Sequence, residues 1–202
     1  MKKIILIITM VVSTLIMQGC KQGMDLQPQD YFDGQQLDIA KAIYDGDRPQ
    51  LDKLLSSVNK EILNRPAKEE MTLLFWAINN AIYDKTTPER LEIITDLVKA
   101  GADPLQPQPN TPGSPAEFVM KANKGVWIQA MLEGGLSPNA RDKVHNQPII
   151  FESFDAANTE TLKILIAYQV DVNIKGAMSR MPLINALYNS CPEHIEVLLA
   201  HG

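Results

Sequence analysis

The chain lacks the residues and motifs on which most enzymes and nucleic-acid-binding proteins depend. It has only three histidines, and none stands at ligand spacing with a cysteine or a carboxylate, so no zinc site is expected. There is no Gly-x-Ser-x-Gly, no phosphate-binding glycine loop and no His-Glu-x-x-His. Basic residues number 19 against 24 acidic ones, which argues against binding nucleic acid through bulk charge. We therefore expect no enzyme activity, no catalytic residue, no metal, no cofactor and no small-molecule substrate.

Long apolar runs are also scarce, and the one that stands out lies at the start of the chain. Lys2 and Lys3 precede the apolar stretch Ile4–Met17, which is too short for a comfortable membrane span. This order of charge and apolar residues is typical of a secretory signal peptide. The stretch is followed by Gly19-Cys20, which resembles the lipobox of bacterial lipoproteins, although Gln18 departs from the usual small residue.

The lipobox resemblance implies removal of residues 1–19 and lipidation of Cys20. Several acyl chains on that residue would anchor the protein stably to a membrane. Lys21 resembles the residue after the cysteine in lipoproteins directed to the outer membrane, which implies a domain facing the periplasm. The alternatives are an ordinary secretory signal and a cytosolic form that starts at Met24. Once Cys20 is lipidated, Cys191 has no partner for an intramolecular disulfide, and we expect it to be partly buried.

After a polar stretch at 20–36, which we interpret as a tether, the chain repeats a helix and a turn. Leu91–Asp103 has apolar residues at helical spacing, and its helix is expected to end at Gly101, because glycine readily adopts the left-handed conformation of a helix end. Equivalent turns recur at Gly135, Gln169 and Gly202, at intervals of 34, 34 and 33 residues. Each turn is followed by a loop and a shorter apolar segment. This period predicts a solenoid of helix pairs.

Short motifs in these repeats resemble the ankyrin-repeat family. Thr72-Leu73-Leu74 and Met181-Pro182-Leu183 stand where the family has Thr-Pro-Leu, and Ala100-Gly101-Ala102-Asp103 matches its Gly-Ala-Asp turn. The resemblance implies an all-α, ankyrin-like repeat solenoid of about five helix-turn-helix units over 37–202. The expected repeats are 37–70, 71–104, 114–138, 147–172 and 181–202.

Several local expectations accompany this prediction. Thr87 or Thr86 is expected to cap the outer helix of the second repeat. The outer helices should bury the core residues Leu97, Ile164 and Leu198. Gly202 occupies the turn position of the fifth copy, so we expect either that the chain continues or that a partner covers the last outer helix.

The family resemblance further implies that the shorter, inner helices and the loop tips form a concave binding surface. It assigns Trp76, Phe118, Phe151 and Asn185 to the same variable position of successive inner helices, although burial of the aromatic rings between helices is the alternative. Loop-tip donors that could meet an acidic patch are Asn139, Arg141, Lys143, His145, Lys175 and Arg180. The candidate partner-binding residues are Trp76, Asn79, Asn80, Phe118, Lys121, Arg141, Lys143, Phe151, Phe154, Asp155, Asn185 and Tyr188.

Small lipid-anchored ankyrin-like proteins resemble the immunity proteins that bacteria pair with antibacterial phospholipase effectors. That resemblance implies a periplasm-facing module that binds and neutralises a secreted toxin, with no nucleic-acid partner. A general scaffold or stress-defence protein of the cell envelope is the alternative.

Overall fold

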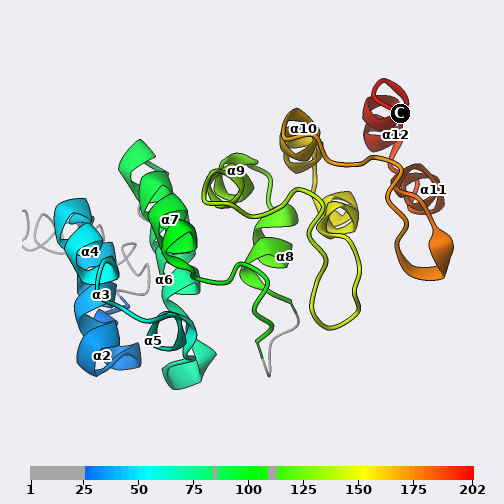
Figure 1. Cartoon of the computed structure of the whole chain (residues 1–202). Helices are drawn as coiled ribbons and strands as arrows, with labels where there is room; N and C mark the ends of the chain where they lie inside the picture. The colour runs from blue at the N-terminus through cyan, green and yellow to red at the C-terminus, as the bar shows by residue number, and fades with distance from the viewer. Residues whose placement is uncertain (1–25, 84–85, 109–112) are drawn as a thin grey trace, which may run out of the picture.

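The computed structural model describes residues 26–83, 86–108 and 113–202. Its helices are arranged as pairs that stack side by side along one axis (Figure 1). The inner helix of each pair is, in order, α3 (Gly34–Asp45), α6 (Leu73–Tyr83), α8 (Pro115–Met120), the 3-10 helix η2 (Ile149–Asp155) and α11 (Pro182–Tyr188). The outer helices are α4 (Arg48–Leu55), α7 (Pro88–Ala100), α9 (Val126–Glu133), α10 (Glu160–Ala167) and α12 (Pro192–Leu199).

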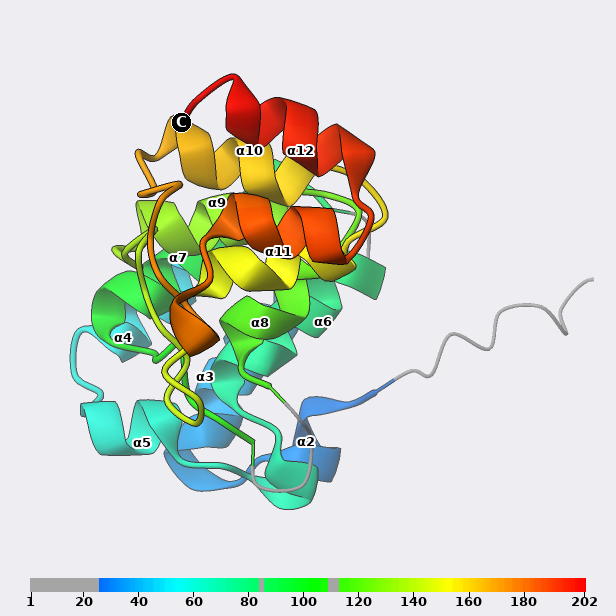
Figure 2. The same cartoon turned by 90° about the vertical axis from the view of Figure 1, so that its right-hand side faces the viewer.

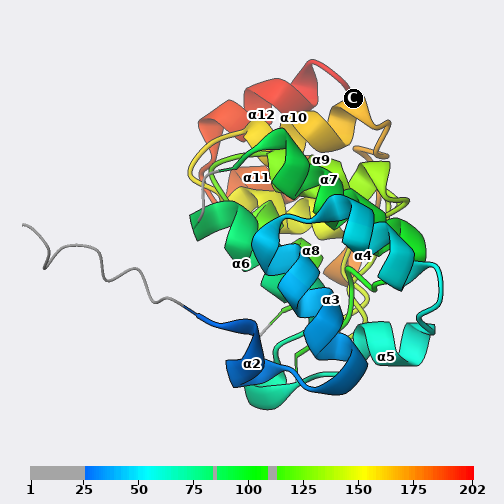
Figure 3. The same cartoon turned by 90° about the vertical axis from the view of Figure 1, so that its left-hand side faces the viewer.

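In the ranges that the structure describes, four short helices lie outside these pairs. They are α2 (Pro28–Tyr31), α5 (Lys60–Asn64), η1 (Lys68–Glu70) and η3 (Ala177–Ser179). The first two lie with α3 at the N-terminal end of the stack (Figure 3). The described residues contain no β-strand, and an isolated bridge joins Arg141 to Pro148. The all-α solenoid expected from the sequence is therefore confirmed. Within the same ranges, no helix combines the length and apolarity that a bilayer crossing requires.

The helix ends follow the residue types at each boundary. Thr87 caps α7 as expected, since its side chain accepts a hydrogen bond from the Arg90 N–H. Left-handed backbone ends the helices at the predicted turn positions, with φ of 108° at Gly101, 111° at Gly135 and 63° at Gln169. The regular interval between turns in the sequence thus corresponds to one repeated backbone conformation.

A continuous apolar core lies between the two rows of helices. Leu97 and Leu198 are buried in it, as expected for outer-helix positions. The expectation for Ile164 was wrong, because its side chain is only partly buried. Leu162 and Leu165 of the same helix are fully buried instead, so α10 is turned slightly from the orientation inferred from its sequence.

The expected tether at 20–36 includes ordered structure in its described part. The chain forms α2, and Phe32 and Gln36 are both buried. The Gln36 side-chain amide donates to the carbonyl oxygens of Ile62 and Arg65, at 2.8 Å each. These contacts attach the start of α3 to α5 and to the residue that follows it. The folded domain therefore begins before residue 37, while residues 1–25, including the lipidation candidate Cys20, lie outside the described residues.

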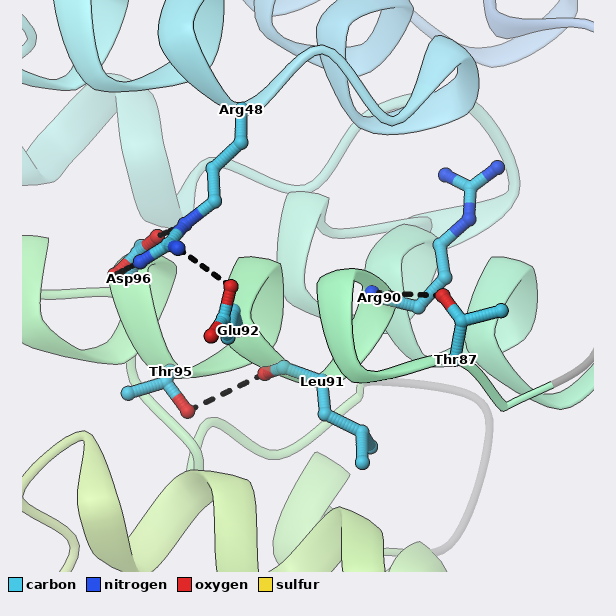
Figure 4. A network of polar contacts seen from close by, with 7 residues as sticks. All are labelled: Arg48, Thr87, Arg90, Leu91, Glu92, Thr95 and Asp96. Atoms are coloured by element: carbon cyan, nitrogen blue, oxygen red, sulfur yellow. Dashed lines mark hydrogen bonds and ion pairs between the residues drawn. The ribbon is translucent and has the colours of Figure 1, made fainter.

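Polar side chains connect neighbouring outer helices (Figure 4). Arg48 of α4 pairs with Asp96 of α7, with 2.6 Å between Nε and Oδ2, and also with Glu92. Thr95 of α7 donates to the carbonyl oxygens of Leu91, at 3.2 Å, and Ala130 in α9, at 3.0 Å. Contacts of this kind fix the spacing between repeats, and so the relative placement of the inner helices.

Candidate protein-binding surface

Trp76 belongs to the core, so its expected placement on the concave surface is corrected. Its side chain is 1 % exposed, and its indole N–H donates to the Ala40 carbonyl at 2.9 Å. The ring is surrounded by Tyr31, Phe32 and Tyr44, with ring centroids 5.8, 5.8 and 6.2 Å away. Because two of these rings come from the segment around α2, Trp76 attaches that segment to the first two helix pairs.

Phe151 and Phe154 are also buried, at 7 % and 6 % exposure, which corrects the same expectation for both. The two positions are three residues apart, so they lie on one side of η2, and that side faces the core. Their rings meet edge to face at 6.1 Å, and Phe154 packs against the ring of His194 in α12 at 5.6 Å. These two side chains therefore join the fourth pair of helices to the fifth.

Other candidates lie on the surface of the inner helices. Phe118 is 49 % exposed and packs edge to face on Phe75 at 5.9 Å. Lys121 lies between two carboxylates of η2, with its Nζ 2.9 Å from Glu152 and 3.6 Å from Asp155. The hydrogen bond with Glu152 raises the pKa of Lys121. This ion pair joins the end of α8 to η2, and the three side chains together carry a net negative charge.

The three asparagine candidates are half-buried. Asn80 donates to the Trp76 carbonyl, one turn earlier in α6, at 2.7 Å. Asn79 lies against the sulfur of Met71, and Asn185 lies on α11. Tyr188, at the end of α11, is 70 % exposed. The Arg180 guanidinium lies 4.7 Å from the centre of its ring, so the two side chains form a cation–π pair at the surface.

Two loops project beside the inner helices on the same side of the stack, and we call 141–147 and 175–180 the C-terminal fingers (Figure 1). The loops lie close to each other when the stack is viewed from its C-terminal end (Figure 2). Asp142, 6 % exposed, accepts hydrogen bonds from the backbone N–H groups of Val144, His145 and Gln147 within the first finger. The Gln147 side chain accepts from the Ala177 N–H at 2.7 Å in the second. Arg141 donates to the carbonyls of Asn146 and Lys175. Both fingers are thus held in shape before any partner binds.

The finger tips expose apolar side chains that the sequence did not single out. Val144 is 64 % exposed and Met178 is 83 % exposed. A detectable signal was present, because Met178 is an apolar residue in a polar loop between Gly176 and Arg180. The backbone of Met178 is also left-handed, with φ of 52°. Exposure of this residue and its conformation are therefore both unusual for methionine.

Metal and pocket chemistry contribute little to this surface. The described residues hold no group of three or more His, Cys, Asp or Glu side chains that could bind a metal ion. A cavity of about 520 Å³ beside α2 is lined in part by Asp33, Gln36 and Arg65. Those three side chains already bond to one another, since Arg65 donates to both Gln36 and Asp33. The cavity therefore offers no unpartnered group among them.

No protein-family model and no curated protein matches the sequence. Among solved structures, the chain is similar to the ankyrin repeat domain of Bcl-3, described as a unique member of the IkappaB protein family. The similarity has a TM-score of 0.60 and covers 82 % of this chain and 71 % of that one. The chain has an ankyrin repeat fold. Sequence identity is 19 %, so the likeness concerns the fold alone. Ankyrin repeat domains are typically non-catalytic modules that bind other proteins.

Proposed function

We propose that this protein is an immunity protein of a bacterial cell envelope, anchored by lipid at Cys20 and facing the periplasm. In that role it binds and neutralises a secreted antibacterial effector of the phospholipase type. The support for the anchor is the sequence Gly19-Cys20 after the apolar run Ile4–Met17. The support for the toxin partner is the resemblance of small lipid-anchored ankyrin-like proteins to immunity proteins.

The observation that carries binding is the exposed surface that joins the inner helices to the C-terminal fingers. Phe118, Tyr188 and Met178 expose large apolar side chains, and Arg180 contacts both the Tyr188 ring and the Met178 sulfur. Aromatic and arginine side chains contribute disproportionately to tight protein interfaces. Hydrogen bonds from Arg141 to Lys175 and from Ala177 to Gln147 hold the fingers in place, which lowers the entropic cost of binding.

The immunity function is tested with the toxin-type genes adjacent to the gene for this protein. Each product is exported to the periplasm of a susceptible strain, with and without the full-length protein. We expect the protein to restore growth against one of these products and to form a complex with it. Replacing Phe118 and Tyr188 together with alanine should weaken that complex by about 2 kcal/mol or more. Both side chains are exposed, so the melting temperature should change little.

A deletion strain that resists every adjacent toxin as well as the parent strain does would reject the immunity function and favour the envelope scaffold. Unchanged affinity in the doubly substituted protein would instead show that the partner does not bind through Phe118 and Tyr188.

The lipid anchor is tested separately with Cys20→Ala. The thiol is the acceptor of the diacylglycerol in the proposed reaction, so the variant should lose labelling by a radioactive or clickable fatty acid. It should also remain as an uncleaved precursor. Normal membrane fractionation of the variant after a high-salt wash would contradict lipidation at this cysteine.

A further inference from the structure

The C-terminal fingers carry basic charge on a protein that is acidic as a whole. Their basic residues are Arg141, Lys143, Lys175 and Arg180, and their one acidic residue is Asp142, while the chain has a net charge of −5. Asp142 is buried and its carboxylate accepts three backbone hydrogen bonds. Within the described residues Lys143 pairs with Asp103, whereas no carboxylate pairs with the other three cations. The fingers therefore present positive charge that the described part of the chain does not neutralise.

The tip of the second finger has backbone angles that its residue types disfavour. Ala177–Arg180 is a tight turn, closed by a hydrogen bond of 3.1 Å from the Arg180 N–H to the Ala177 carbonyl. Both central residues have positive φ, 52° at Met178 and 55° at Ser179. Turns with two such residues favour Asn-Gly, because residues with a longer side chain are strained there.

Met178 is thus held in an unfavourable conformation and is also exposed, and its sulfur accepts a contact from the Arg180 guanidinium at 3.6 Å. Arg180 beside it is fixed over the Tyr188 ring, with its planar guanidinium available to a carboxylate. A flexible thioether adapts well to an irregular apolar surface. The tip therefore combines an adaptable apolar contact with a pre-positioned cation.

We propose that the C-terminal fingers and Tyr188 bind an acidic segment of the partner protein, whose carboxylates pair with Lys175 and Arg180 while an apolar side chain covers Met178. This rests on the proposed function only in taking the partner to be a protein. Charge complementarity identifies the occupant, because an acidic segment would meet attraction at the fingers and repulsion over most of the remaining surface.

The chain supplies a matched control for this proposal. The turn Lys68–Met71 has the same construction, with positive φ at Glu69 and Glu70 and a closing hydrogen bond of 3.2 Å from the Met71 N–H to the Lys68 carbonyl. Asn-Gly can replace the central pair in either turn. Met178→Asn with Ser179→Gly removes the proposed contact, whereas Glu69→Asn with Glu70→Gly changes a tip that carries acidic side chains.

The test selects binders from a displayed library of random 16-residue peptides, using the full-length protein in detergent. Enriched peptides should be rich in Asp and Glu beside at least one large apolar residue. Their affinity should fall about tenfold or more in the Met178/Ser179 variant and stay within about twofold in the Glu69/Glu70 variant. The melting temperature of the Met178/Ser179 variant should not fall, because Asn-Gly suits the turn. Loss of binding could then not be explained by unfolding.

Arg180→Gln adds a readout that a merely structural role would not change. It should slow association with the selected peptides and flatten the dependence of affinity on salt. Three outcomes would overturn the proposal. They are enrichment of basic or uncharged peptides, an equal loss of affinity in both turn variants, and the absence of any enriched peptide.

A membrane is the other class of partner that basic, apolar-tipped loops could meet. Vesicles of phosphatidylethanolamine with one-quarter phosphatidylglycerol are therefore tested with the same variants. If the protein binds these vesicles through Met178 and selects no acidic peptides, the partner of the fingers is a lipid surface and not an acidic protein segment. Growth protection against a toxin tests the immunity function independently, so failure of either proposal is distinguishable from failure of the other.

Discussion

Replacing Trp76 with alanine is expected to destabilise the N-terminal end of the domain severely. The side chain is 1 % exposed, and its ring contacts Tyr31, Phe32 and Tyr44. Truncation of a buried tryptophan to alanine costs about 3–5 kcal/mol. Loss of the hydrogen bond to the Ala40 carbonyl accounts for about 1 kcal/mol of that sum. A domain of ordinary stability has about 5–15 kcal/mol in total, so this single change removes a large part of it.

Trp76→Phe separates the two contributions. It keeps most of the apolar contact and removes the indole donor, so we expect a cost of about 1–2 kcal/mol. Urea unfolding followed by far-UV circular dichroism measures the free energy of each variant. Hydrogen exchange should accelerate most in α2, α3 and α6, because neighbouring repeats share the buried face.

Phe118→Ala is the control for this experiment, since its ring is half exposed and its loss should cost less than about 1 kcal/mol. A Trp76→Ala protein whose unfolding free energy lies within about 1 kcal/mol of the parent would refute the assignment of this ring to the core. So would unchanged exchange in α2.

Three smaller predictions concern helix packing, capping and charge. Gly134→Ala should cost about 1–3 kcal/mol in urea unfolding, because a Cβ there would lie 2.5 Å from the Cβ of Val98; an unchanged midpoint would contradict this close approach. Thr87→Ala should cost about 1 kcal/mol in the same assay by removing the cap of α7, whereas Thr87→Ser should cost much less. The hydrogen bond with Glu152 raises the pKa of Lys121. This pair should therefore stabilise the fold fully below pH 10.5, the ordinary lysine value, and less as pH rises through the raised pKa. The contribution should stay below about 1 kcal/mol because the Lys121 side chain is half exposed, and Lys121→Met should remove it from the curve of stability against pH.

The repeat architecture was predictable because one backbone conformation recurs at a fixed interval. Gly101 and Gly135 have the residue type expected for a left-handed helix end, but Gln169 adopts that conformation without being glycine. The interval of 34 residues predicted a turn at Gln169, whereas the residue type alone did not. Helical spacing predicted the core positions of the outer helices except at Ile164, where the neighbouring Leu165 is the fully buried residue. A pattern of apolar residues fixes the buried side of a helix only approximately.

The buried aromatic residues were less predictable because their burial depends on elements with weak sequence signals. Trp76 is covered from α2, a four-residue helix within a polar segment without apolar periodicity. Phe151 and Phe154 lie on the side of η2 that faces the core, and nothing in its sequence marked that side as the buried one. The basic finger residues were recognised from charge alone, whereas Met178 required the exposure and backbone angle that the structure supplies.

The 3-10 helix η2 has a consequence for how this protein could change over generations. In a 3-10 helix each residue advances by about 120°, against about 100° in an α-helix, so between Ile149 and Phe154 the two forms differ by about 100°. Buried side chains, more than its backbone hydrogen bonds, hold η2 in its present form. A few core substitutions that favour the α-helical form would rotate Phe154 away from His194 and re-aim the last helix pair with its finger. Substitutions in η2 alone could therefore change the orientation of the last helix pair during evolution. The preceding repeats could keep their sequence while the binding surface adapts to a changed partner.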